Sequence, residues 1–194
     1  VDKSQPAYEC LKGIELAAKD AAHTVRRLRE IGKPIDTSTY THVDLNDIVK
    51  DVVAAVFPAW QASDTPAEAE ISVETQLASN CIVLGNATEL REALTNLLLN
   101  AVQSIDEKGR IDILTECDDK FAYLKVQDTG SGMDEETRKR LFDPFYTTRG
   151  AEGTGLGMSM VDAISLRHRG KVFVDTAPGT GTLVTIRLPR YGVA

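Results

Sequence analysis

Apolar residues recur at steps of three and four along the start of the chain, with charged side chains between them. This spacing predicts one long amphipathic helix from Pro6 to Ile31, which ends before Gly32 and Pro34. The polar link GKPIDTSTYTH follows, so we expect the apolar stripe of this helix to pack against a helix from outside this sequence. The stripe consists of Leu11, Ile14, Leu16, Ala18, Ala21, Ala22, Val25 and Leu28.

The next segments alternate between helical and strand-like patterns. Residues 43–60 read as a second helix, with Asp44 as its N-cap and Pro58 closing it. Short apolar or alternating runs at 71–77 and 81–85 indicate strands, and helical periodicity returns over 88–105.

The second half of the chain is richer in strands. Residues 110–117 and 121–128 indicate a strand pair, and 171–176 and 181–189 a closing hairpin around APGTG. Glycine-bearing loops with a short helix occupy 129–155, before a helix over 156–167. These elements predict an α+β fold: a two-layer α/β sandwich in which one mixed sheet carries helices on one face.

Charge and composition exclude several classes of function. The 194 residues carry 22 basic and 29 acidic side chains, a formal charge of -7, and no basic cluster that could follow a nucleic-acid backbone. No apolar run approaches the roughly 20 residues that span a bilayer, so we expect no membrane contact by this segment. Cys10, Cys81 and Cys117 lack zinc-site spacing, which favours a reducing, cytoplasmic compartment.

Two asparagines interrupt the core-like helix over 88–105. Asn96 and Asn100 share a stripe with Glu92 and Ser104 at four-residue steps. Asparagine is a poor helix former, so placing it twice costs stability that alanine would keep. The pair could bind buried backbone groups or face solvent, or the Asn100 carbonyl oxygen could meet a hard cation such as Mg2+.

Two glycine-rich stretches could hold a flat, phosphorylated ligand. In VQDTGSGM, Asp128 leaves a strand, and Gly130 and Gly132 allow close backbone approach, although such a turn is common and weak evidence by itself. An ionised carboxylate there could accept a hydrogen bond from the exocyclic amine of adenine. In GTGLG, glycines precede a helix whose free N–H groups favour phosphate, without the strand of a Rossmann motif or the lysine of a Walker loop.

Five motifs together resemble the catalytic ATP-binding domain of sensor histidine kinases, of the nitrogen-regulatory and dicarboxylate-sensor type. This domain shares the Bergerat (GHKL) fold with gyrase, Hsp90 and MutL. The resemblance covers about residues 41–190 and implies a partial dimerisation and phosphotransfer helix over 1–33, a linker over 34–43 and the ATP-binding domain over 44–194. The motifs, in the family's order, are NLLLNA (Asn96 to Ala101), DTGSGM (Asp128 to Met133), LFDPFYTTR (Leu141 to Arg149), GTGLGMSM (Gly153 to Met160) and GTGT (Gly179 to Thr182).

The resemblance assigns a role to each motif. Asn100 would hold Mg2+, Asn96 would lie beside the phosphates of ATP, and Arg149 would meet the γ-phosphate. Asp128 would bind the adenine amine, with Thr182 assisting through water. Phe142 and Phe145 would anchor the lid, although Phe145 fits plain core packing equally well. The remaining implied nucleotide-binding residues are Gly130, Gly132, Met133, Gly153, Thr154, Gly155, Leu156 and Gly157.

One departure from the hydrolysing relatives concerns the reaction. Those relatives carry a glutamate where this chain has Asn96, and an amide cannot take a proton from water at neutral pH. Transfer to another nucleophile is therefore favoured over hydrolysis. The alternatives are an ATPase of the gyrase and Hsp90 kind and a nucleotide-binding regulatory module without catalysis.

The histidines do not match the family's phosphoacceptor motif. The resemblance implies an acceptor on a helix before Val1, a homodimer through the N-terminal helix, and a response-regulator receiver domain as partner. We expect His23 to be an interface residue, His42 and His168 to lie on the surface, and this segment alone not to autophosphorylate.

Overall fold

The computed structural model describes Leu11, Val25 and residues 36–61, 70–150 and 153–192. The chain divides into two units, Val1–Lys33 and Pro34–Ala194. The predicted helix from Pro6 to Ile31, with Cys10 and His23, lies outside the described residues apart from Leu11 and Val25. The fold described below is that of the second unit.

A five-stranded mixed sheet forms one layer of this unit, in the order β2-β4-β5-β7-β6. Its parallel pair, β2 with β4, could not be read from the sequence, whereas the other neighbouring strands are antiparallel, as expected. The strands are β2 (Glu70–Leu77), β4 (Lys108–Cys117), β5 (Phe121–Asp128), β6 (Lys171–Thr176) and β7 (Thr182–Pro189).

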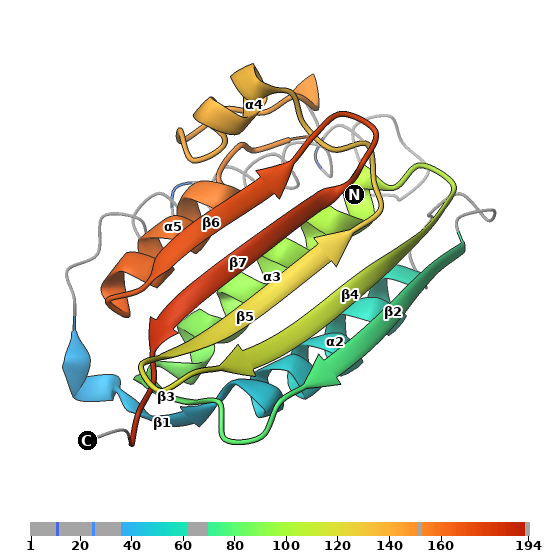
Figure 1. Ribbon diagram of the computed structural model, residues 1–194. Helices are drawn as coiled ribbons and strands as arrows, with labels where there is room; N and C mark the ends of the chain where they lie inside the picture. The colour runs from blue at the N-terminus through green and yellow to red at the C-terminus, as the bar shows by residue number, and fades with distance from the viewer. Residues whose placement is uncertain (1–10, 12–24, 26–35, 62–69, 151–152, 193–194) are drawn as a thin grey trace. The chain divides into compact units, whose positions relative to one another are not determined.

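Three helices form the second layer, all on one face of the sheet (Figure 1). They are α2 (Leu45–Gln61), α3 (Ala87–Ser104) and α5 (Gly157–Arg167). The sheet turns alternate side chains toward them, and in β5 these are the buried Ala122, Leu124 and Val126. The predicted two-layer α+β sandwich is confirmed, and a short helix, α4 (Glu135–Arg140), lies within the predicted loop region.

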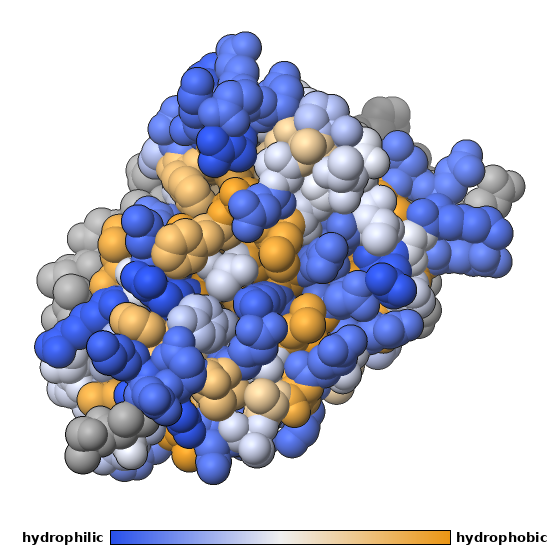
Figure 2. All heavy atoms as spheres, viewed as in Figure 1, coloured by the Kyte–Doolittle hydropathy of each residue, from blue (hydrophilic) through white to orange (hydrophobic). Residues whose placement is uncertain are grey.

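The other face of the sheet carries a mixture of hydrophilic and hydrophobic residues (Figure 2). The Arg187 guanidinium lies 4.5 Å from the ring centroid of Phe121 and 5.1 Å from that of Phe173. Such cation–π contacts let aromatic side chains cover a sheet face while cations remain in water. Among the described residues, no helix is long and apolar enough to cross a membrane.

Two details of the predicted elements are wrong. The expected linker over 34–43 contributes a strand, β1 (Thr41–Asp44), which pairs antiparallel with β3 (Ile82–Gly85) as a second sheet. Pro58 lies inside α2 and does not close it. Proline forfeits the hydrogen bond to the carbonyl of Ala54, but Pro58 and Ala54 are both exposed, so water can satisfy that group. The Asp44 cap is confirmed, because its carboxylate accepts from Asn46 N–H at 2.9 Å.

His168 was expected at the surface but is buried, with 4% of its area exposed. Its Nε2 accepts a hydrogen bond from Asn86 N–H at 3.0 Å, and its Nδ1 lies 2.8 Å from the Ile164 carbonyl, so the neutral ring donates through Nδ1. The ring also stacks on Tyr40 with centroids 4.8 Å apart. Burial lowers the pKa of His168 below its ordinary value. This imidazole joins the end of α5 to the start of α3, where the Asn86 side chain caps the helix.

Candidate functional site

The two asparagines of α3 lie beside the first turn of α5. Asn96 is 4% exposed, and its amide nitrogen donates to the Glu92 carbonyl at 2.9 Å. A Cβ added to Gly157 would lie 3.5 Å from Asn96 Oδ1 and 3.7 Å from Asn100 Oδ1. Both amide oxygens therefore lie close to the N-terminus of α5, where free N–H groups and the helix dipole favour an anion.

Asp128 ends β5 with a buried, strongly hydrogen-bonded carboxylate. Its Oδ1 accepts from Gly130 N–H at 2.8 Å, from Ser104 Oγ at 3.1 Å and from Thr182 N–H at 3.2 Å. No donor among the described residues binds Oδ2. It is nevertheless not a buried atom without a partner, because in the described part of the chain the Ser165 hydroxyl is the one such side-chain atom. Oδ2 therefore reaches solvent and is free to accept a hydrogen bond from a ligand.

The environment of Asp128 opposes its ionisation. Burial raises the pKa of this carboxyl, while the hydrogen bonds from Gly130, Ser104 and Thr182 pull it back toward the ionised form. Only 6% of the residue is exposed. A carboxylate whose other oxygen is held this firmly is suited to recognising one donor group on a ligand.

Glycine is required at two positions after Asp128. A Cβ on Gly130 would lie 2.2 Å from Ser104 Oγ and 2.5 Å from the Ser104 carbonyl oxygen, at the end of α3. Gly132 has φ 65° and faces the Ala177 carbonyl oxygen, which a Cβ would meet at 2.0 Å. The loop thus crosses two backbones at a distance that no side chain allows.

Thr182 faces Asp128 from the start of β7 and belongs to a small hydroxyl network. Its Oγ1 lies 3.1 Å from Thr176 Oγ1, which also accepts from Met133 N–H at 3.0 Å. Thr182 is 8% exposed, whereas Met133 is half-buried. The network holds the DTGSGM loop against β6 and β7, and the Asp128 carboxylate joins it through the backbone N–H of Thr182.

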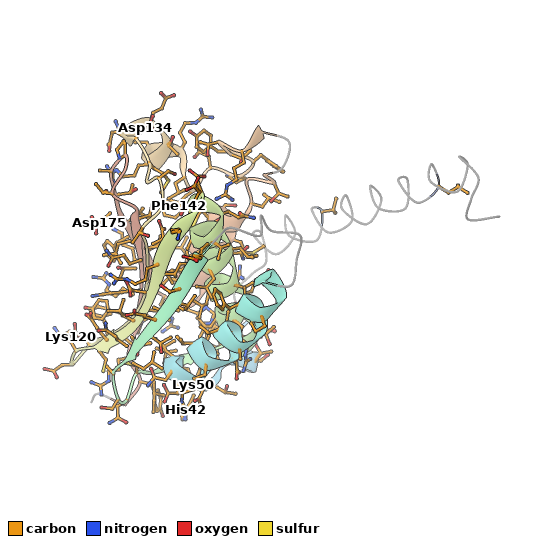
Figure 3. The ribbon with its side chains drawn as sticks, turned by 90° about the vertical axis from the view of Figure 1, so that its right-hand side faces the viewer. His42, Lys50, Lys120, Asp134, Phe142 and Asp175 are labelled. Carbon is orange, nitrogen blue, oxygen red and sulfur yellow. The ribbon has the colours of Figure 1, made fainter. Side chains whose placement is uncertain are left out.

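The segment between α4 and α5 contains Phe142. Phe142 and Asp134, the N-cap of α4, lie toward the end of the sheet opposite Lys120 and His42 (Figure 3). Phe142 is half-buried, whereas Phe145 is 57% exposed with φ 69°, so the core-packing alternative for Phe145 is wrong. Its N–H donates to the carbonyl of Gly155 at 3.0 Å. Gly155 has φ 63° and packs on the backbone of Phe145, which a Cβ would meet at 2.4 Å.

The rest of the GTGLG motif divides into exposed and buried parts. Thr154 is exposed, and Gly153 packs on Thr147, whose Oγ1 a Cβ would meet at 2.1 Å. Leu156 is fully buried, so its side chain is not available to a ligand. Its side chain holds the N-terminal end of α5 in the core.

Arg149 reaches back to α3 from the end of LFDPFYTTR. One guanidinium nitrogen donates to the Gln103 side-chain carbonyl, and the other to the Asn100 backbone carbonyl at 3.4 Å. The guanidinium therefore lies against α3 at the backbone of Asn100. In this position it contributes a positive charge to the same face of α3.

The structure brings four of the predicted residues, Asn96, Asn100, Asp128 and Arg149, together along α3. Asn96, Asn100 and Ser104 follow one another along α3 and contact, in turn, the α5 end, the Arg149 guanidinium and Asp128. Ser104 and Gln103 were not predicted as site residues, although Ser104 belongs to the same four-residue stripe. Nothing in the sequence marks Thr176, because its partners come from other strands.

Known proteins resemble this chain in sequence and in fold. Residues 85–192 match the family described as histidine kinase-, DNA gyrase B- and HSP90-like ATPase. The sensor histidine kinase RppB of a Synechocystis species is 34% identical over 77% of this chain and 33% of its own length. The signal transduction histidine-protein kinase AtoS of Escherichia coli is 31% identical over 96% of this chain and 30% of its own.

A solved structure agrees with these relatives. The mycobacterial sensor histidine kinase MprB superimposes with a TM-score of 0.66 at 26% identity, covering 77% of this chain and 97% of that structure. The chain spans about a third of the length of the two curated relatives.

Proposed function

Because the chain belongs to the family of histidine kinase-, DNA gyrase B- and HSP90-like ATPases, for which ATP is the common ligand, we propose that it is the catalytic core of a sensor histidine kinase. Residues 44–194 would bind Mg-ATP and transfer its γ-phosphoryl group to a histidine. The residues before β1 would link this domain to a dimerisation helix in 1–33. The acceptor histidine would lie on a helix outside this chain, with the phosphoryl group passing on to a response-regulator aspartate.

Asp128 would bind the adenine. Its Oδ1 is occupied by three donors, so the free Oδ2 would accept from the exocyclic amine. Thr182 binds Asp128 through its backbone N–H, and its hydroxyl would hold a bridging water, while Gly130, Gly132 and Met133 would line the flat base. A base lacking this amine would leave the buried carboxylate unpaired, which is costly and therefore selective.

Asn100 would bind Mg2+ and the N-terminus of α5 the phosphates. The described residues hold no cluster of three His, Cys, Asp or Glu side chains that could cage a metal. Mg2+ fits this arrangement nonetheless, because it keeps several waters and commonly takes one or two protein oxygens besides substrate phosphates. The Asn100 side-chain amide lies beside Gly157, which has no side chain to block the approach of such an ion.

The segment between α4 and α5 would close over the phosphates as a lid. Arg149 would exchange its neutral partners, the Gln103 amide and the Asn100 carbonyl, for the γ-phosphate, to which charge-assisted hydrogen bonds are stronger. Phe142 would anchor this segment while the exposed Phe145 supports its turn. Gly153, Thr154, Gly155 and the backbone of Leu156 would contact phosphate oxygens.

The observation that carries transfer over hydrolysis is the amide at position 96. It lies beside the α5 end, where hydrolysing relatives place a general base, but it donates to the Glu92 carbonyl and has no basic atom. No base at position 96 would then deprotonate water near the γ-phosphate, so hydrolysis would be slow. Transfer would require a histidine positioned to attack the γ-phosphate. Positioning and charge neutralisation supply most of what phosphoryl transfer requires.

The proposal is tested by following the γ-phosphoryl group. The chain is incubated with labelled ATP and Mg2+, alone and with the two-helix hairpin of a sensor-kinase relative such as AtoS. We expect negligible phosphate release by the chain alone and acid-labile phosphate on the hairpin histidine. Asn100→Ala and Asp128→Asn should abolish the label, whereas Asp118→Asn, at the other end of β5, should retain it.

Three other results would change this proposal. Steady ATP turnover without an acceptor would support the ATPase alternative, despite the amide at position 96. Acid-labile phosphate on His23 of the chain alone would place the acceptor inside this segment. ATP binding without label on any histidine or in water would favour a regulatory module.

A further inference from the structure

Two of the three cysteines lie together at the end of the sheet opposite the nucleotide site. Cys81 immediately precedes β3 and Cys117 ends β4. In the β4–β5 pairing, Cys117 lies opposite Ala122, whereas Asp128 lies opposite Ile111 at the other end. Figure 3 shows the same end through Lys120, in the turn between these two strands.

Three sets of hydrogen bonds hold the two cysteine-bearing segments together. Ala78 N–H donates to both the carbonyl and the hydroxyl of Thr115, at 3.2 and 3.0 Å. The Cys117 thiol lies 3.4 Å from the Ser79 carbonyl, to which it donates. The connection from β2 to β3, just before Cys81, thus contacts the end of β4 at Cys117.

The third set comes from one arginine that bridges the neighbours of both cysteines. The Arg190 guanidinium donates to the carbonyl of Asn80 at 3.2 Å and to that of Asp118 at 2.9 Å. Asn80 directly precedes Cys81, and Asp118 directly follows Cys117. A single rigid group therefore fixes the spacing of the two backbones beside the thiols.

The two thiols differ in exposure. Cys81 is fully buried, and burial, with a hydrogen bond to the Cys117 thiol, raises its pKa to about 11. Cys117 is partly exposed. Because an oxidant from solution can reach only the exposed sulfur, the pair has an entry thiol and a buried partner in contact with it.

We propose that Cys81 and Cys117 form a reversible oxidation site, at which a hydroperoxide converts the two thiols to an intradomain disulfide. The Cys117 thiolate attacks one peroxide oxygen, the O–O bond breaks, and the leaving hydroxide takes the thiol's proton to become water. Cys81 sulfur then attacks the sulfur of the resulting sulfenic acid, and the Cys81 proton leaves with the sulfenic oxygen as a second water. Two thiols and one hydrogen peroxide thus yield one disulfide and two waters, and a dithiol reductant reverses the change.

The disulfide would connect β3 to the end of β4 and close a loop that contains all of α3. Closing such a loop restricts the unfolded chain, so oxidation should raise the melting temperature by about 5–10 °C. Because the pair lies at the far end from Asp128, we expect ATP affinity to change less than about twofold on oxidation. The site is thus independent of the nucleotide pocket, and its test does not depend on kinase activity.

Peptide mapping tests this proposal directly. Trypsin places each cysteine in its own peptide, 4–12, 51–91 and 111–120, so every pairing has a distinct mass. The reduced, folded chain is treated with hydrogen peroxide, blocked with an alkylating reagent and digested. We expect the peptides of Cys81 and Cys117 linked to each other, with the link removed by dithiothreitol.

Two variants separate the steps. Cys10→Ser should leave the linked pair unchanged, because that thiol takes no part. Cys81→Ala, which keeps the buried position small and apolar, should stop oxidation at a Cys117 sulfenic acid that a dimedone-type reagent traps. Links to Cys10 in the folded chain would overturn the proposal, as would Cys117 oxidised to sulfinic acid beside a reduced Cys81.

Discussion

Replacing Asp128 by asparagine should separate ligand recognition from stability. The new amide oxygen can still accept from Gly130, Ser104 and Thr182, so the loop keeps its hydrogen bonds. The amide nitrogen then takes the place of Oδ2 and meets the adenine amine donor to donor. A hydrogen bond to a charged group contributes about 1.5–3 kcal/mol, so we expect the Kd for ATP to rise about 10- to 150-fold.

The same change should not weaken the fold. Burial raises the pKa of Asp128 in the folded protein, so the stability that this carboxyl contributes is present below its unfolded pKa and lost as pH rises through the folded value. At neutral pH the buried charge is therefore unfavourable, and a neutral amide removes that cost. Thermal unfolding at pH 7 should give a melting temperature equal to or above that of the unchanged chain.

Asp118→Asn is the matched control. Hydrogen bonds from the Tyr123 hydroxyl and from the N–H groups of Lys120 and Phe121 lower the pKa of this exposed carboxyl, so its ionised form is favoured in the folded state. The same chemical change should here leave ATP binding intact and lower the stability slightly at neutral pH. Calorimetric titration and thermal unfolding of both variants provide the readouts. Unchanged ATP affinity in Asp128→Asn, or its unfolding, would refute the assignment.

Three further outcomes follow from the geometry. Gly130→Ala should cost about 1–3 kcal/mol in urea unfolding, because its Cβ would meet Ser104 Oγ at 2.2 Å, and equal stability would contradict this packing. Asn100→Ala should make ATP affinity insensitive to EDTA, and retained metal dependence would place Mg2+ on another group. Burial lowers the pKa of His168, so its stabilising effect is complete above the unfolded value near 6.5 and lost as pH falls through the folded one. Unfolding measured between pH 7.5 and 5 should therefore show a decline that His168→Gln reduces, and an equal decline in both would exclude this histidine.

Elements with a strong local pattern were predictable from the sequence. The bounds of β5 and β6 agree with their alternating runs, and α3 differs from its predicted range by one residue at each end. The local sequence pattern did not predict structure that depends on contacts between residues far apart in the sequence. Strand β1 lies in a polar link without alternation and exists because β3 pairs with it. The burial of His168 likewise depends on Tyr40 and Asn86, which are far away in the sequence.

The candidate site divides in the same way. Ordered motifs indicated Asn96, Asn100 and Asp128 as candidates, because their spacing relates them to a known family. The partners that hold these residues are less visible, since Ser104 reaches Asp128 only after α3 packs on β5. No sequence motif includes Thr176 or Gln103. Their contacts with Met133 and Arg149 depend on side-chain geometry that sequence spacing does not determine.

The most direct test of the account is calorimetric titration of the unchanged chain with ATP, with and without Mg2+. The arrangement of Asp128, Asn100 and the α5 N-terminus predicts saturable binding of one nucleotide, about micromolar in Kd, that weakens when Mg2+ is removed. GTP, whose base carries a carbonyl oxygen where adenine carries its exocyclic amine, would place two acceptors against each other at Asp128 and should bind far more weakly. Absence of ATP binding, or equal affinity for the two nucleotides, would contradict the account.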